Sequence, residues 1–311
     1  MTAGPAAPAG PGPIGPVSRV GHVGRVGLVG LGLVGAALGA RLRGAGFEVL
    51  GFDRREEANA AWVHAGGQVA SSLRELSGLC SCAVLAVFDT HGVIEVVEGP
   101  AGLLEGGAVR ALIDCSTGAP DALSALAARL EKLGVAFLEA PLSGSSQQIA
   151  DGTATMLLGG EAAFIDEQGA LLDAITPRRF HVGGAGMGAR AKLATNLVLG
   201  LNRAALAEGF VFAERLGIAP QTFLELVLAT PARSEAALAK GEKMVTGDFT
   251  PQSRIHQHLK DVQLMIGAAA ATGQRLPLTE TPAALLRAAV DAGDGELDNA
   301  AILRQLRRET R

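Results

Sequence analysis

The sequence predicts an α/β fold, in which a parallel-sheet domain is followed by one long helix and an all-helical C-terminal domain. From residue 25 to about residue 182, compact apolar runs alternate with segments of helical period, as strands alternate with crossover helices. After the glycine cluster at residues 183–188, helical period continues without further strand-like runs. The chain of 311 residues is 48% apolar, which is enough to fill a core in each of two domains.

The composition divides the chain into three parts. Residues 1–17 are almost entirely Ala, Pro and Gly and cannot bury enough apolar surface to fold. We therefore expect a disordered tail over residues 1–24, the sheet domain over residues 25–186 and the helical domain over residues 187–311.

The elements of the sheet domain follow from this alternation. We expect strands at residues 25–31, 48–52, 82–87, 111–114, 136–139, 155–158 and 179–182. Helices are expected between them at residues 33–44, 55–65, 72–79, 119–132 and 162–174.

The second domain begins with an unusually long helical segment. Residues 189–216 contain no proline and only two internal glycines, and their apolar positions recur with helical spacing. Further helices are expected at residues 220–228, 235–244, 255–271, 282–292 and 300–309.

Charge and cysteine content exclude several classes of protein. The net charge is −4, and the 27 basic and 31 acidic residues are scattered, so no basic surface for nucleic acid is expected. Cys80, Cys82 and Cys115 are too few and too close for a disulfide framework or a four-ligand zinc site. We expect reduced, buried thiols and no metal.

Membrane insertion and secretion are not expected either. The longest uncharged apolar run, residues 26–40, has 15 residues and five glycines, too few and too flexible for a membrane span. The N-terminal stretch lacks the cationic start and apolar core of a secretory signal. A cytoplasmic location is therefore expected.

A glycine motif lies where the first strand should turn into the first helix. Residues Gly30-Leu31-Gly32-Leu33-Val34-Gly35 match GxGxxG. In this pattern the first glycine permits the tight turn, the second lets the main chain approach a pyrophosphate, and the third lets helix and strand pack closely. The motif and its context predict a Rossmann-type domain that binds a dinucleotide.

Two neighbouring residues at the end of the second strand bear on which dinucleotide is bound. Asp53 stands where a carboxylate would accept hydrogen bonds from the adenosine ribose and repel a 2′-phosphate, which favours NAD. The guanidinium of Arg54 could pair with a 2′-phosphate instead, which leaves NADP open. The chain contains no tyrosine, which excludes the Tyr-Lys proton relay of short-chain dehydrogenases.

Four further segments carry a family resemblance. They are Asp114-Cys-Ser-Thr-Gly-Ala-Pro120, Phe137-Leu-Glu-Ala-Pro-Leu-Ser-Gly144 with Ala150-Asp-Gly152, the stretch from Gly184 to Asn196, and Lys260-Asp261. In this order after the glycine loop, they resemble the β-hydroxyacid dehydrogenases, relatives of 3-hydroxyisobutyrate and 6-phosphogluconate dehydrogenases. The resemblance runs from about residue 26 to residue 306. It implies an NAD(P)-dependent oxidoreductase that transfers a hydride between nicotinamide and the β-carbon of a small 3-hydroxy acid.

The resemblance also implies residue roles. Lys192 falls on the catalytic lysine, and Ser143, Gly144 and Asn196 fall on substrate-binding positions, beside Ser145, which stands where a second glycine is usual. Thr117 and Lys260, with Val87 and Phe88 at a strand end, fall on cofactor-contacting positions.

Residue spacing supports the assignment of Lys192 independently of the resemblance. Lys192 and Asn196 are four residues apart, so they share one helix face and can reach the same ligand. The apolar surroundings of Lys192 would lower its pKa toward the range that a proton shuttle needs.

Other interpretations remain open at this point. Among enzymes, the alternative is a reductase of glyoxylate or a short semialdehyde, and among non-enzymes it is a dinucleotide-binding sensor. His256 and His258 point to different faces of a helix, so a shared metal ion is not expected. Long apolar helices favour a homodimer or homotetramer, as the resemblance also implies.

Overall fold

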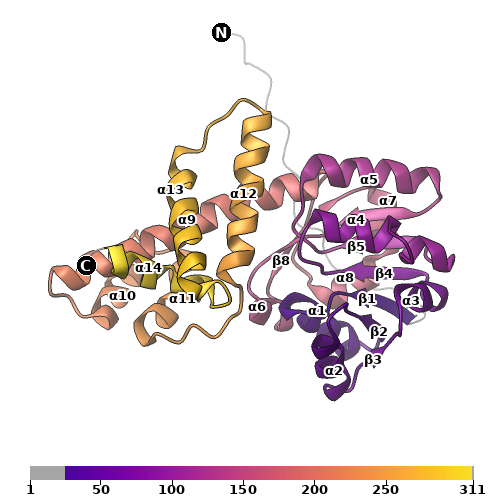
Figure 1. The fold of residues 1–311 in the computed structure, drawn as a ribbon, viewed down its shortest axis with the longest axis horizontal. Helices are drawn as coiled ribbons and strands as arrows, with labels where there is room; N and C mark the ends of the chain where they lie inside the picture. Colours follow the sequence, from indigo (N-terminus) through magenta and orange to yellow (C-terminus); the bar gives the residue numbers. More distant parts are fainter. Residues whose placement is uncertain (1–24, 310–311) are drawn as a thin grey trace, which may run out of the picture.

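A computed structural model of the chain describes residues 25–309, so the expected tail over residues 1–24 lies outside the described residues. Figure 1 shows two parts, a sheet covered by helices and a group of helices beside it. Helix α9 (Met187–Arg215) leaves the sheet part and runs through the middle of the helical part. This arrangement confirms the α/β fold with an all-helical C-terminal domain.

The sheet has the strand order of a dinucleotide-binding domain. Its order is β3-β2-β1-β4-β5-β6-β8-β7, with β9 on β8, and the strands from β1 to β6 run parallel. Strand β8 is antiparallel to β6 and β7 and parallel to β9. The strands are β1 (Arg25–Val29), β2 (Glu48–Phe52), β3 (Gln68–Val69), β4 (Cys82–Leu85), β5 (Ala111–Asp114), β6 (Ala136–Glu139), β7 (Leu142–Ser143), β8 (Thr155–Gly159) and β9 (Arg179–Gly183).

Helices cover both faces of this sheet, so its central strands are apolar except at their ends. The side chains of Leu28 in β1 and Leu112 in β5 are completely buried, and they belong to separate apolar clusters. The covering helices are α1 (Leu33–Gly44), α2 (Glu56–His64), α3 (Leu73–Leu79), α4 (Thr90–Glu98), α5 (Pro120–Lys132), α6 (Ser146–Ala150), α7 (Ala162–Glu167) and α8 (Gly169–Ile175), with a 3-10 turn at Leu103–Gly106.

The helical domain packs around α9. Its centre is the completely buried side chain of Phe210, whose ring meets that of Phe223 edge to face at 5.0 Å. The other helices are α10 (Pro220–Ala229), α11 (Glu235–Thr246), α12 (Ile255–Ala271), α13 (Pro277–Ala289) and α14 (Ile302–Glu309), with a π-helical turn at Val290–Asp294 and a 3-10 turn at Asn299–Ala301. No helix within residues 25–309 combines the length and apolar character needed to cross a membrane.

Several short elements of the structure were not predicted from the sequence, and α4 is the longest of them. Its Gly92 and its β-branched residues disfavour a helix locally. The helix forms because the Asp89 carboxylate accepts the Gly92 N–H at 2.8 Å as an N-cap, and because Val93 and Val97, one turn apart, are both buried. Tertiary burial therefore decides the conformation. Strands β3 and β7 and helix α6 were also missed, each having five residues or fewer.

Two helices have different limits from those expected. The single helix expected over residues 162–174 is divided into α7 and α8, because Gln168 between them has ψ near 8° and leaves the helical conformation. Helix α13 begins at Pro277 instead of Pro282. Pro277 occupies the first turn, where a missing N–H costs nothing, and Pro282 is accommodated inside the helix.

Candidate active site

The glycine loop connects β1 to α1 in the geometry that a pyrophosphate requires. Gly30 has φ +91°, and a Cβ there would lie 2.3 Å from the Ala86 carbonyl oxygen. A Cβ on Gly35 would lie 1.7 Å from the Gly30 carbonyl oxygen, so only glycine lets α1 approach the strand. Gly32 is the N-cap of α1, and since it has no side chain, it makes no capping bond to the first turn of this helix. These N–H groups fit a phosphate at a helix N-terminus.

The acidic residue after β2 is already engaged by the chain itself. One Asp53 carboxylate oxygen accepts the Leu31 N–H at 2.8 Å, and both oxygens accept from the Arg55 guanidinium at 3.0 Å. Burial alone would raise the pKa of Asp53, but the bonds from Arg55 and Leu31 outweigh it and hold the pKa below its usual value. Arg54 is exposed.

Arg55 is the cation nearest to this carboxylate, and the sequence analysis did not single it out. Its guanidinium also lies 3.6 Å from the place where a Cβ on Gly32 would be. The pattern Asp-Arg-Arg offers two cations, and the sequence alone does not say which of them turns back toward the loop.

The loops after β4 and β5 form the next part of the wall. The Val87 N–H donates to the Ser116 hydroxyl at 3.1 Å, which ties the two strand ends together. Lys260 on α12 donates to the carbonyl oxygens of Phe88 and Thr117, at 2.7 and 2.8 Å. The helical domain therefore holds both loops that were expected to contact the cofactor.

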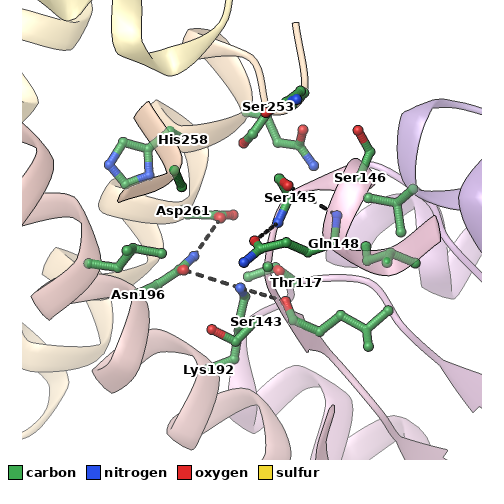
Figure 2. Close-up of a pocket in the computed structure, with 18 of the residues that line it drawn as sticks. Thr117, Ser143, Ser145, Ser146, Gln148, Lys192, Asn196, Ser253, His258 and Asp261 are labelled. Atoms are coloured by element: carbon green, nitrogen blue, oxygen red, sulfur yellow. Dashed lines mark hydrogen bonds between the residues drawn. The ribbon is translucent and has the colours of Figure 1, made fainter. Parts of the chain in front are cut away.

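A cavity of about 430 Å³ opens between these loops and the helical domain. Six expected cofactor or substrate residues lie along the sheet domain's side of it, namely Val34, Val87, Thr117, Ser143, Gly144 and Ser145. Lys192 and Asn196 line it from α9, and Figure 2 shows them beside Asp261 of α12.

Lys192 is buried at the centre of this cavity wall, with only 6% of its surface exposed. Its Nζ donates to the Leu142 carbonyl oxygen at 2.7 Å and to Asn196 Oδ1 at 3.1 Å. Burial lowers the pKa of Lys192 to about 8, against the raising effect of Asp261. An amine with this pKa can both accept and return a proton near neutral pH.

Asn196 connects Lys192 on α9 to Asp261 on α12. Its Nδ2 donates to Asp261 Oδ2 at 3.0 Å, and Lys260 lies 3.0 Å from the other oxygen of the same carboxylate. The amide orientation is therefore fixed, with its oxygen toward Lys192. This network explains why Lys260-Asp261 accompanies the lysine motif in the sequence.

The buried side chain of Glu139 anchors the N-terminus of α9. No role for this residue was predicted from the sequence. Glu139, the last residue of β6, accepts the N–H groups of Gly186 and Gly188 at 2.6 and 3.2 Å. Burial raises the pKa of Glu139 to about 7, although these N–H bonds oppose the rise. Lys192 lies little more than one turn beyond this anchor, so Glu139 positions it.

The turn after β7 lines the cavity with Gly144 and Ser145. Gly144 is tightly packed, since a Cβ there would lie 2.9 Å from Ala154 Cβ. Ser145 caps α6: its hydroxyl accepts the Gln148 N–H at 3.2 Å, and its own N–H donates to Gln148 Oε1 at 2.8 Å. The Ser145 hydroxyl thus has a structural task, in addition to lining the cavity.

Several buried polar residues of the cavity were not predicted. Arg203 of α9 and Lys240 of α11 line it, and both are about 95% buried, with 5% of their surface exposed. His258 is buried beside them, and burial lowers its pKa well below the usual value, so its ring is neutral. Within residues 25–309 no group of three or more His, Cys, Asp or Glu side chains could hold a metal ion.

Comparison with known families divides the chain at the start of α9. Residues 25–183 match the model described as the NAD binding domain of 6-phosphogluconate dehydrogenase. Residues 186–306 match the model described as NAD-binding of NADP-dependent 3-hydroxyisobutyrate dehydrogenase.

Individual relatives agree with these models. The chain is 30% identical to 2-(hydroxymethyl)glutarate dehydrogenase of Eubacterium barkeri over 88% of its own length and 92% of that protein. It is 25% identical to glyoxylate/succinic semialdehyde reductase 2 of Arabidopsis thaliana, over 89% of its own length and 78% of that protein. The crystal structure of 3-hydroxyisobutyrate dehydrogenase from Salmonella typhimurium superposes with a TM-score of 0.81 at 28% identity, covering 90% of this chain and 99% of that one.

Proposed function

This chain belongs to the β-hydroxyacid dehydrogenase family and is an NAD(P)-dependent oxidoreductase of hydroxy acids, and from that premise we propose that Lys192 is its catalytic acid/base. The proposed reaction moves a hydride between the nicotinamide and the β-carbon of a small 3-hydroxy acid. The observation that carries the proposal is the burial of Lys192 in the cavity, with a pKa of about 8.

The cofactor residues follow from the geometry of the sheet edge. The N–H groups at the start of α1 would hold the pyrophosphate, Asp53 and Arg55 would meet the adenosine ribose, and Thr117 would meet the nicotinamide ribose. Bound NAD(P) would accept or supply the hydride.

The chain's own groups would handle the proton and the substrate. In oxidation, the neutral Lys192 amine accepts the proton of the substrate hydroxyl, and in reduction the ammonium returns it. Asn196, held by Asp261, keeps the Nζ oriented and offers the hydroxyl a partner. The Ser143 hydroxyl and the main chain at Gly144 suit the substrate carboxylate. Burial of Lys192 and Asn196 keeps water from competing for the proton.

Reduction of glyoxylate or a short semialdehyde is the second candidate, and one observation favours it. With a pKa of about 8, Lys192 is mostly protonated at neutral pH and is ready to act as an acid. One relative is named as a glyoxylate/succinic semialdehyde reductase. Both candidates use the same residues in opposite directions.

The experiment that tests the proposed role is Lys192→Met, which keeps the length of the side chain and removes the amine. We expect kcat to fall by about 10²-fold or more, while the affinity for the reduced cofactor, measured by fluorescence titration, changes little. Lys132→Met, at an exposed position of α5, is the matched control. Turnover of the Lys192 variant at close to the normal rate would contradict the proposal.

We also propose that the protein is a homodimer or homotetramer. The support is a set of large apolar side chains exposed on and near α9: Val198, Phe212, Leu216, Leu226 and Leu238. Light scattering of the purified protein tests this, and a monomer at all concentrations would contradict it.

A further inference from the structure

Arg203 is a buried cation in the cavity that the proposed reaction does not use. It lies on α9, only 5% of its surface is exposed, and it lines the cavity. Its Nε and Nη1 atoms are buried, and no hydrogen-bond acceptor meets them within residues 25–309. Burial lowers the pKa of Arg203 to about 10, so the guanidinium remains charged at neutral pH.

The two carboxylates that attract Arg203 are engaged by other groups. Asp298 accepts Lys240 Nζ at 2.8 Å and the Gln252 N–H at 2.8 Å through one oxygen, and the Ala300 N–H at 3.0 Å through the other. Asp261 accepts from Asn196 at 3.0 Å and pairs with Lys260. Arg203 therefore has no counter-ion of its own among residues 25–309.

An unpartnered guanidinium at this depth is costly, because it has lost water without gaining acceptors. The buried charges around the cavity are also unbalanced. Lys192, Arg203 and Lys240 stand against the carboxylates of Asp261 and Asp298. An anion in this part of the cavity would supply both the missing acceptors and the missing charge.

The position of Arg203 on α9 says where that anion would lie. Lys192, Asn196, Leu199 and Arg203 all line the cavity, which is the spacing of a single helix face. Eleven residues separate Lys192 from Arg203, which places their Cα atoms about 16 Å apart. The neutral His258 ring lies between them, against Gly200, where a Cβ would come within 2.9 Å of it. Arg203 thus lies farther along the cavity than Asn196, although its charge still contributes to lowering the pKa of Lys192.

We propose that the substrate carries a second anionic group, a carboxylate or a phosphate, several bonds away from the hydroxyl-bearing carbon, and that Arg203 binds it. This inference rests on the proposed function, because the reacting end of the substrate is placed at Lys192. Arg203 is then a specificity-determining residue, and Lys240, paired with Asp298, adds positive potential beside it. The cavity selects a dianionic hydroxy acid over one with an apolar or neutral end.

The test compares substrates that differ only at the distal end. The probes are 3-hydroxyadipate, its distal amide, and the analogue with a distal phosphonate, with kcat/KM followed by absorbance of the reduced cofactor. In the unmodified protein we expect the dianions to exceed the amide by about 10–100-fold. The better of the two dianions identifies whether the carboxylate or the phosphate form is preferred.

Variants of Arg203 test whether this residue causes the preference for dianionic substrates. Arg203→Met should bring the ratio of dianion to amide close to one, and Arg203→Lys should retain part of it. Arg190→Met, an exposed arginine on the same helix, is the matched control and should keep the ratio of the unmodified protein. Because the readout is a ratio within one protein, a general loss of active enzyme does not imitate the effect. An unchanged ratio in Arg203→Met would overturn the proposal.

A binding measurement covers the case in which Arg203→Met does not fold. Adipate and hexanoate, which lack the reacting hydroxyl, are titrated into the unmodified protein with reduced cofactor bound. Tighter binding of adipate supports the second anion site, and equal binding overturns it. If adipate binds tightly but no 3-hydroxy acid is turned over, the proposed function fails and the anion site stands. If the amide is turned over as well as 3-hydroxyadipate, the function stands and the anion site fails.

Discussion

The two sides of the cavity are built differently. The glycine loop on one side depends on residues that have no side chain, whereas α9 on the other side carries buried charged side chains. Gly30 and Gly35 leave no room for a Cβ, and Gly32 leaves the first turn of α1 uncapped. Lys192 and Arg203 on the other side are almost completely withdrawn from solvent. We therefore expect the glycine-loop side to be disrupted when atoms are added, and the α9 side to be disrupted when a charge is removed or titrated.

The largest effect expected from this comparison is that of one added methyl group. Gly35→Ala would place a Cβ 1.7 Å from the Gly30 carbonyl oxygen, and neither atom can move away without a shift of the backbone. We expect a loss of more than about 4 kcal/mol in the free energy of unfolding, measured by urea denaturation. Gly44→Ala on the same helix, where no atom lies within 4 Å, is the control. It should change stability by less than about 1 kcal/mol. Equal stabilities of the two variants would show that the close approach at Gly35 does not require glycine.

A smaller effect is expected at the carboxylate that joins the two walls. Glu139 has a folded pKa of about 7, raised by burial above its unfolded value of 4.5. The fold therefore favours the protonated form, and the stabilising effect, complete below pH 4.5, is lost as pH rises toward about 7. Glu139→Gln keeps an acceptor for Gly186 and cannot ionise. From acid to neutral pH, the free energy of unfolding should fall by about 2–3 kcal/mol more in the unmodified protein than in the variant. Parallel pH profiles of the two proteins would show that the burial of Glu139 carries no such cost.

Titration of Lys192 should be visible in catalysis. Because its folded pKa is about 8, oxidation, which needs the neutral amine, should accelerate about tenfold per pH unit up to that value and then level off. Reduction, which needs the ammonium, should be constant below that value and decline above it. The measurement is kcat/KM in both directions against pH. Profiles with the same slope in the two directions would mean that another group transfers the proton.

The smallest effect is expected on the preference between NAD and NADP, since this preference depends on the exposed Arg55 guanidinium beside the Asp53 carboxylate. Arg55→Met would free Asp53 from its partner and strengthen the repulsion of a 2′-phosphate. We expect kcat/KM with NADP to fall by about tenfold relative to that with NAD. Arg54→Met is the comparison variant, and a smaller change is expected, because it is the Arg55 side chain that hydrogen-bonds to the Asp53 carboxylate. A larger shift from Arg54 would assign the ribose contact to that residue instead.

The two walls also differ in how far the sequence predicted them. The glycine loop was predicted in detail, because a turn that excludes Cβ atoms leaves a mark at fixed spacing. Lys192 and Asn196 were recognised because they lie four residues apart beside a family motif. Arg203 was not, since an arginine within a long helix usually lies on the solvated face, and only the packing of the domain's other helices around α9 buries it. Arg55 was missed for a similar reason, because the sequence does not show which of two adjacent arginine side chains turns toward Asp53.

The continuity of α9 fixes distances in a way that a cavity between two domains ordinarily does not. The helix has 29 residues, about 43 Å, and carries Lys192, Asn196 and Arg203 without a break. A hinge movement between the domains would change the gap to the nicotinamide side but not the interval between these three side chains. If Arg203 binds the distal anion as proposed, the helix sets the distance between the two ends of the substrate, because closing the domains does not change the spacing of these residues. Selection for substrate length would then follow the helix axis, however tightly the cofactor side is closed.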